Sequence, residues 1–172
     1  GNSYPRSGTT WNDLSGNGFN FTIDGAGFTY NTGGWFDMAN GGITYADNIT
    51  DSTTCTLVFW MRTTDTQALF WAKTAAAPYL GAYSAGNKFY NSGFGSPTLF
   101  MNTVSKANLY DFITGEWIMI EFKSVDMSSI DYNNFNQYSN FSFGDGDISI
   151  IKIYDRNLTT EESLQNYNSM KD

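Results

Sequence analysis

The sequence predicts an all-β domain in which two antiparallel sheets pack face to face as a sandwich, followed by one short C-terminal helix. Short apolar runs recur along the chain between Gly, Asn and Asp residues, as strands do when tight turns join them. The composition agrees, because 17% of the residues are aromatic and only 15% are charged, which favours strands over helices. No long helical periodicity alternates with the runs, which argues against a parallel sheet. The 172 residues are expected to form a single domain, 1–172.

The strands are predicted where β-type residues run between turn residues. In chain order, they are Phe19–Ile23, Gly27–Tyr30, Gly34–Met38, Thr54–Arg62, Gln67–Lys73, Tyr79–Tyr83, Lys88–Asn91, Thr98–Thr103, Glu116–Ser124, Ser139–Phe143 and Asp147–Tyr154. The segments 75–78, 86–87 and 92–97 are rich in Gly, Ala and Asn and are predicted to be loops.

Two of these runs show the faces of the sandwich most clearly. In 54–62, alternate apolar residues share one face: Cys55, Leu57, Phe59 and Met61. In 116–124, the same alternation places Ile118, Ile120 and Phe122 on one face. The opposite faces are mixed, with Thr54, Thr56, Val58, Trp60 and Arg62 on the first run and Trp117, Met119, Glu121 and Lys123 on the second. Two sheets that pack by their apolar faces satisfy this pattern.

One helix is predicted near the C-terminal end. The sequence Thr159-Thr160-Glu161-Glu162 is typical of a capping box, in which Thr159 caps the first turn and Glu162 reaches back to it. Leu164 and Tyr167 then lie three residues apart on one face. We expect a helix from Thr160 to Ser169, packed on the edge of the sandwich.

Composition excludes several classes of function. The chain has no histidine, so no Ser-His-Asp or Cys-His catalytic set can form and histidine-based zinc sites are ruled out. A formal net charge of −8 argues against binding to nucleic acid or to an anionic membrane. The apolar runs are too short to span a bilayer. Cys55 lies within an apolar strand, which predicts a buried thiol without a disulfide partner.

A glycoside hydrolase is the enzymatic alternative, and it needs two carboxyl groups that face each other across the sugar. Glu116 and Glu121 are five residues apart on one predicted strand, so they face opposite sides. Asp145 and Asp147 do alternate, but Gly-Asp-Gly-Asp is more typical of a turn that enters a strand. A loop that binds calcium or a polar ligand is the second interpretation of that stretch. We therefore predict that the domain is not an enzyme.

The candidate metal site is the polar loop Asn12–Gly18. Asp13 and Asn17 carry oxygen ligands of the kind that calcium prefers, and the glycines of the loop permit tight turns that bring carbonyl groups together. The alternative is an Asx-type turn closed by the same two side chains. No cofactor is required by the sequence, and calcium is a candidate ligand.

Aromatic residues are the other candidate feature, because sugars stack on exposed aromatic faces. The central strands and loops contain Trp35, Trp60, Trp71, Tyr79, Tyr83, Tyr90 and Phe94. Packing in the core or at a sheet edge is the default interpretation for each of them. Three flank loops rich in Gly and Asn and are therefore expected to be more exposed: Tyr83, Tyr90 and Phe94. These three are the candidate ligand-binding residues.

Two segments near opposite ends of the chain resemble a known family. The first is Tyr4–Gly18, and the second is Gly146–Thr159 with the Glu161-Glu162 and Gln165–Asn168 stretches that follow. Together they resemble the laminin-G-like, concanavalin A-like jelly-roll domains, and in particular those of virion proteins of tailed bacteriophages. The resemblance brackets nearly the whole chain, whereas the middle matches in strand pattern alone.

The resemblance implies a non-enzymatic domain on the virion surface, as part of a fibre, an appendage or the capsid decoration. Its partners would be other virion proteins or a parent fibre protein, together with glycans of the host or environmental surface, and it could form a homo-oligomer. Two alternatives share the fold. One is a purely structural decoration or cementing module that acts by protein–protein contact, and the other is a bacterial secreted lectin-like adhesion domain.

The chain departs from the family pattern at two places. Ser149 stands where many relatives outside phages carry an acidic residue that helps to hold calcium, so Asp13 and Asn17 alone are carried over as metal ligands. Relatives also begin with an apolar strand just before the Gly-Asn-Ser segment, whereas this chain begins at Gly1. We expect a piece of a longer protein, or a first strand supplied by something else, and hence an open sheet edge that invites pairing.

Overall fold

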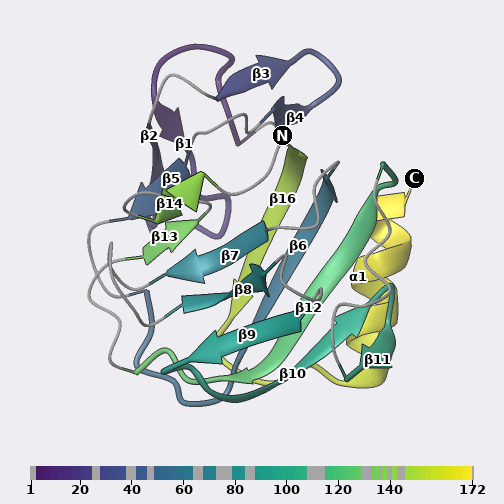
Figure 1. Cartoon of the computed structure of the whole chain (residues 1–172). Coiled ribbons are helices and arrows are strands. Elements are labelled where there is room, and N and C mark those ends of the chain that lie inside the picture. Colours follow the sequence, from purple (N-terminus) through teal and green to yellow (C-terminus); the bar gives the residue numbers. More distant parts are fainter. Residues whose placement is uncertain are drawn as a thin grey trace.

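The computed structural model is a β-sandwich with one C-terminal helix, as the sequence predicts (Figure 1). The structure describes residues 3–24, 28–37, 42–45, 49–63, 68–72, 79–83, 88–107, 115–128, 133–135, 137–138, 141–142 and 146–171. Within these ranges, two seven-stranded antiparallel sheets face each other, and a two-stranded hairpin lies beside them.

The first sheet contains the strands with the weakest sequence signals. Its spatial order is β1 (Thr10–Trp11), β2 (Phe21–Asp24), β5 (Gly42–Tyr45), β13 (Asn133–Phe135), β7 (Ala68–Ala72), β8 (Tyr79–Tyr83) and β9 (Lys88–Ser92). The small hairpin consists of β14 (Gln137–Tyr138) and β15 (Phe141–Ser142). These strands have two to five residues each. Among them, β2, β7, β8 and β9 match predicted strands, whereas β1, β5 and β13 have no predicted counterpart.

The second sheet contains the long strands. Its spatial order is β11 (Val104–Lys106), β10 (Gly95–Met101), β12 (Ile118–Val125), β6 (Cys55–Thr63), β16 (Gly146–Tyr154), β4 (Trp35–Asp37) and β3 (Thr29–Asn31). The centre is β6, which pairs along its length with β12 on one side and with β16 on the other. Every pairing is antiparallel.

The core between the sheets consists of the residues that the alternation predicts. Cys55, Leu57, Phe59 and Met61 of β6 lie in it together with Ile118, Ile120 and Phe122 of β12, and all are at most 2% exposed. Phe59 stacks on Phe135, which comes from the opposite sheet, with ring centroids 5.3 Å apart. Full burial of a side chain of this size stabilises the fold by about 1.5–3 kcal/mol. Cys55 is a buried free thiol, as predicted, and burial raises the pKa of that thiol.

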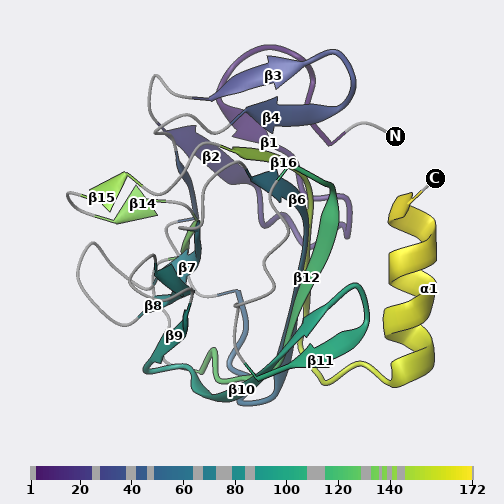
Figure 2. The ribbon, with the colours of Figure 1, turned by 45° about the vertical axis from the view of Figure 1, so that its right-hand side comes forward.

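The helix α1 (Thr160–Lys171) covers the outer face of the second sheet, and the prediction that it packs on the sandwich edge is wrong (Figure 2). Val58 and Met119, on the outward faces of β6 and β12, form a second apolar cluster with Leu158 and Met170. These faces look mixed in sequence because they also carry polar groups. They need a cover because Val58 and Met119 would otherwise expose apolar surface to water.

The predicted capping box is confirmed. The backbone N–H of Thr159 donates to Glu162 Oε2 at 2.9 Å, and the backbone N–H of Glu162 donates to Thr159 Oγ1 at 3.2 Å. The hydrogen bond from Arg156 to the Glu162 carboxylate is the main reason why the pKa of Glu162 falls to about 2. No helix in the described part of the chain is long and apolar enough to cross a membrane.

Candidate functional site

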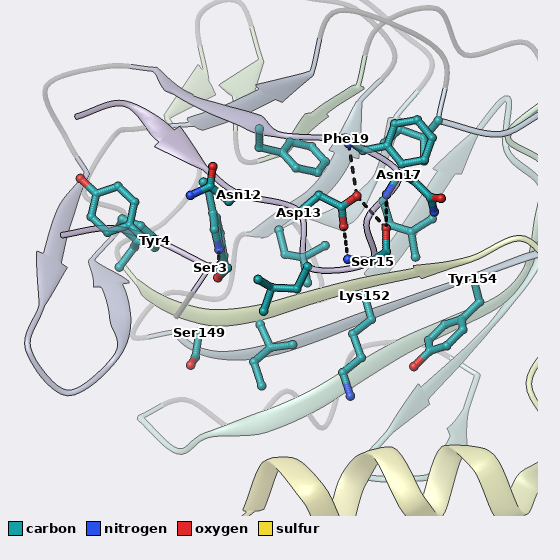
Figure 3. A pocket seen from close by; sticks show the side chains of 18 of the residues that line it. Ser3, Tyr4, Asn12, Asp13, Ser15, Asn17, Phe19, Ser149, Lys152 and Tyr154 are labelled. Atoms are coloured by element: carbon teal, nitrogen blue, oxygen red, sulfur yellow. Dashed lines mark hydrogen bonds between the residues drawn. The ribbon is translucent and has the colours of Figure 1, made fainter. Parts of the chain in front are cut away.

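A cleft of about 1080 Å³ lies between the N-terminal loop and the strand β16 (Figure 3). Its floor is aromatic and apolar, with Tyr4, Trp11 and Phe36 on one side and Ile151 and Ile153 on the other. Its rim is polar. The polar lining residues include Ser3, Asn12, Asp13, Ser15, Asn17, Thr50, Ser149, Lys152 and Asp155.

Asp13 organises the loop that forms one wall of the cleft. Its Oδ1 accepts a hydrogen bond from the Ser15 backbone N–H at 2.7 Å, and its Oδ2 accepts from Ser15 Oγ at 2.6 Å and from the Phe19 backbone N–H at 3.2 Å. Burial acts to raise the pKa of Asp13, but these hydrogen bonds outweigh it and lower that pKa below its ordinary value. The Asn17 backbone N–H donates to Ser15 Oγ at 3.2 Å, which closes the turn.

This hydrogen bonding fits the Asx-type turn, since the Asp13 carboxylate is used to hold the loop. No group of three or more metal-ligating Asp, Glu, His or Cys side chains occurs among the described residues. Ser149 donates from its hydroxyl to the Gly34 carbonyl at 3.0 Å. Calcium at Asp13 and Asn17 stays a prediction that the geometry does not require.

Phe94, one of the three aromatic candidates, is fully buried, so the expectation that it is exposed is wrong. Gly93 and Gly95 flank it with φ angles of 78° and 76°, and this turn directs the ring into the core. Tyr83 and Tyr90 lie on the neighbouring strands β8 and β9, in a register that pairs Tyr83 with Lys88 and Tyr90 with Gly81. Their side chains lie outside the described part of the structure, and their role stays a prediction.

A second candidate site lies on the outer face of the second sheet, and we call it the tryptophan cluster: Trp35, Trp60, Trp117, Arg62 and Asp147. The Trp117 ring lies 6.3 Å from the Trp60 ring in a stacked arrangement and 5.9 Å from the Trp35 ring in an edge-to-face one. The three tryptophans come from β6, from β4 and from the residue before β12. All three are half-buried, so each ring remains partly open to solvent.

A charged pair lies against these rings. The guanidinium carbon of Arg62 lies 5.4 Å from the centroid of Trp117 and 6.0 Å from that of Trp35, which are cation–π distances. Arg62 Nε and Nη2 both donate to Asp147 Oδ2, the first at 2.8 Å. Among the described residues, nothing else bonds to this pair of side chains, so Asp147 Oδ1 and the remaining Arg62 donors can serve a ligand.

The sequence contained part of the signal for this cluster. Alternation places Trp60, Arg62 and Trp117 on mixed strand faces, but packing is the default interpretation for Trp35 and Trp60. What joins them is the β6–β12 register, which pairs Ile118 with Met61 and so brings the two strand ends together. Nothing in the local sequence gives that register or brings Trp35 alongside.

The carboxyl groups of Asp13 and Glu121 do not suit general-acid catalysis of sugar hydrolysis. The cleft is lined by Asp13 and Asp155, and the pKa of Asp13 is lowered, the opposite of what a general acid needs. Glu121 has a raised pKa because it is buried. However, its carboxyl lies under α1, where it accepts a hydrogen bond from Ser163 Oγ at 2.7 Å. Asp145, half of the predicted acidic pair, lies outside the described residues.

Comparison with known proteins identifies the fold. No family model and no curated protein sequence matches the chain. Among solved structures, it is similar to the binding domain of botulinum neurotoxin DC in complex with rat synaptotagmin II, with a TM-score of 0.53, 12% identity and 92% of this chain covered. It is also similar to the binding domain of botulinum neurotoxin serotype G, with a TM-score of 0.51, 13% identity and 91% covered.

The chain spans about half the length of those two structures, 48% of each. At such low identity, the likeness bears on the fold alone. It supports the β-sandwich architecture that the strand pairing shows, and it leaves the phage and lectin relationships as proposals.

Proposed function

We propose that this domain is a non-enzymatic binding domain on a virion surface and that the tryptophan cluster is its glycan-binding site. The observation that carries the proposal is the position of the Arg62–Asp147 pair against Trp35 and Trp117, with hydrogen-bonding capacity left over. This combination of flat apolar rings and planar polar groups is what a sugar needs from its binding site.

The chemistry of a pyranose explains the match. One face of the ring presents C–H groups, which pack against an indole because the aromatic face is apolar and electron-rich. The equatorial hydroxyls point outward from that face. A carboxylate oxygen can accept from one hydroxyl while a guanidinium N–H donates to its neighbour, and such charge-assisted bonds are stronger than neutral ones.

The site should discriminate by shape and bind weakly. The side chains of Arg62 and Asp147 are 36% and 15% exposed, so a ligand displaces water from groups that are already partly dry. A shallow platform of this kind buries a small part of the ligand, and we expect Kd values between micromolar and millimolar, about 4–8 kcal/mol.

The virion setting is supported by the two terminal motifs of the sequence. An acidic chain with a net charge of −8 also suits a molecule displayed in solvent, because like charges oppose non-specific association. Contact with other proteins of the same particle is the second candidate function. It is favoured by the cleft beside β16, which is lined by a strand edge and an aromatic floor.

The proposal is tested by a glycan array followed by calorimetric titration of the best neutral and acidic glycans. Trp117→Ala removes the ring that contacts both other tryptophans and should weaken binding at least tenfold, about 1.4 kcal/mol. Leu14→Ala, which trims a side chain that is 68% exposed on the cleft loop, is the control and should leave the affinity unchanged. The proposal is contradicted if no glycan on the array binds, or if Trp117→Ala binds the glycan with the same affinity as the wild type.

A further inference from the structure

The strand β16 is paired on both sides at its start and on one side for the rest of its length. With β4, its pairs are Asp147–Asp37 and Ile148–Phe36. With β6, the ladder continues from a bulge after Ile148 to the pair between Tyr154 and Thr56. Among the described strands, none pairs with the second side of residues 149–154.

An unpaired side of a strand presents alternate backbone N–H and C=O groups that have no ladder partner. The described backbone hydrogen bonds outside regular strands and helices do not involve residues 149–154. Six residues of strand extend for roughly 20 Å. This length gives a template for an added strand of about six residues.

The cleft lies directly along this open side. The loop that holds Asp13, Ser15 and Asn17 forms its far wall, and β16 forms its near wall (Figure 3). Ile151 and Ile153 pack towards the inner core, whereas Lys152 and Tyr154 both reach Asn166 of α1 on the outer face, with Lys152 Nζ 2.9 Å and Tyr154 Oη 3.1 Å from Asn166 Oδ1.

The two faces of β16 determine what a neighbouring strand must carry. Cross-strand neighbours point to the same face. An added strand would therefore point every second side chain to the floor formed by Tyr4 and Trp11 beside Ile151 and Ile153. Those side chains must be apolar, and the intervening ones must be polar. Leu14, which is 68% exposed on the loop, adds apolar surface at the entrance.

We propose that this open side of β16 binds an extended segment of a separate polypeptide as an added antiparallel or parallel strand. The segment has about six residues, with apolar side chains at alternate positions and a basic residue near one end. Charge complementarity supports the basic residue, because the described lining has two carboxylates, Asp13 and Asp155, against one cation, Lys152, and the whole chain has a net charge of −8. This inference gives the second candidate function a defined partner and is independent of the glycan site.

The experiment is hydrogen exchange of the backbone amides, followed by NMR on the whole domain. The probes are synthetic eight-residue peptides with Val, Ile, Phe or Tyr at alternate positions, Thr between them and Lys at both ends. In the free protein, we expect alternate amides of 149–154 to exchange rapidly. The best-binding peptide should slow their exchange at least tenfold. The matched control is the same peptide N-methylated at alternate residues so that it cannot donate to β16, and it should give no protection.

Three results would overturn the proposal. The first is that no peptide slows amide exchange in 149–154, and the second is that the N-methylated peptide slows it equally. The third is that these amides already exchange slowly without peptide, and more slowly as the protein concentration rises. The last result would indicate that a second copy of the chain occupies the edge. Trp117→Ala separates the two proposals, because peptide protection should survive this change whether or not the domain binds a glycan.

Discussion

Glu121 is a residue whose burial has a consequence for stability. Its side chain is fully buried between β12 and α1. One oxygen is bonded to Ser163, and the other has no hydrogen-bond partner among the residues that the structure describes. Lys123 Nζ is 3.9 Å away. Burial raises the pKa of Glu121 above its ordinary value of 4.5, despite opposing contributions from Ser163 and Lys123. The folded state therefore holds this proton more tightly than the unfolded state does.

The sign of the pH dependence follows from that difference. As pH rises from about 4.5 through the raised pKa, the folded state retains a proton that the unfolded state has lost, so this group makes stability fall. Glu121→Gln should remove this part of the pH dependence. The measurement is urea unfolding of both proteins between pH 4 and 8, with the exposed Glu116→Gln as the control. Parallel curves for wild type and Glu121→Gln would contradict the assignment.

Gly33 permits the position of Trp35 in the tryptophan cluster. A Cβ atom at Gly33 would lie 1.9 Å from Cζ3 of the Trp35 ring, which is far inside contact distance. Gly33→Ala should therefore displace the ring and weaken glycan binding several-fold, while the neighbouring exposed Thr32→Ala should not. Tryptophan fluorescence and calorimetry report the two effects. Unchanged tryptophan emission and glycan affinity in Gly33→Ala would contradict the prediction that a Cβ atom at this position displaces the Trp35 ring.

The burial of single residues could be predicted from the sequence where strand alternation determines it, but not where a turn does. Cys55 and Phe59 are buried as predicted, because each occupies an inward position of a long strand. Phe94 was expected to be exposed because glycines surround it. The same glycines form the turn that buries it, and Asp126 N–H donates to its carbonyl at 3.0 Å.

At the scale of elements, the start of α1 provides a direct test. Thr159→Ala removes the hydroxyl that accepts from the Glu162 N–H and should cost about 1 kcal/mol of unfolding free energy. Thr160→Ala, one position later and exposed, is the matched control and should change stability by less than about 0.5 kcal/mol. Chemical denaturation measures both. Equal losses of unfolding free energy in the two variants would show that the loss in Thr159→Ala does not come from the capping hydrogen bond.

The long strands were all predicted, whereas only some of the short ones were. The predicted strand Thr54–Arg62 differs from β6 by one residue at each end, and the predicted strand Asp147–Tyr154 differs from β16 by one residue at its start. In contrast, β1, β5, β11, β13 and β14, which have two to four residues, have no counterpart among the predicted strands. The segment predicted as a loop at 92–97 is largely strand. Its Pro97 lies within the register shift of β10, where a missing N–H is tolerated.

At the scale of the whole molecule, both candidate sites depend on strand pairing between distant segments. The tryptophan cluster needs β4, β6 and β12 in one sheet, and the cleft needs the N-terminal loop beside β16. The sequence predicted a sandwich. Which strand would be open, and which aromatics would gather, follow from a topology that local patterns do not encode.

Glycan binding by the tryptophan cluster is tested by following the indole N–H signals of the five tryptophans by NMR during titration with the best array glycan. We predict that the signals of Trp35, Trp60 and Trp117 shift together. Trp11, whose indole N–H donates to Ser3 Oγ at 2.6 Å in the cleft, should keep its signal. A shift of Trp11 without the other three, or no shift at saturating glycan, would contradict the claim.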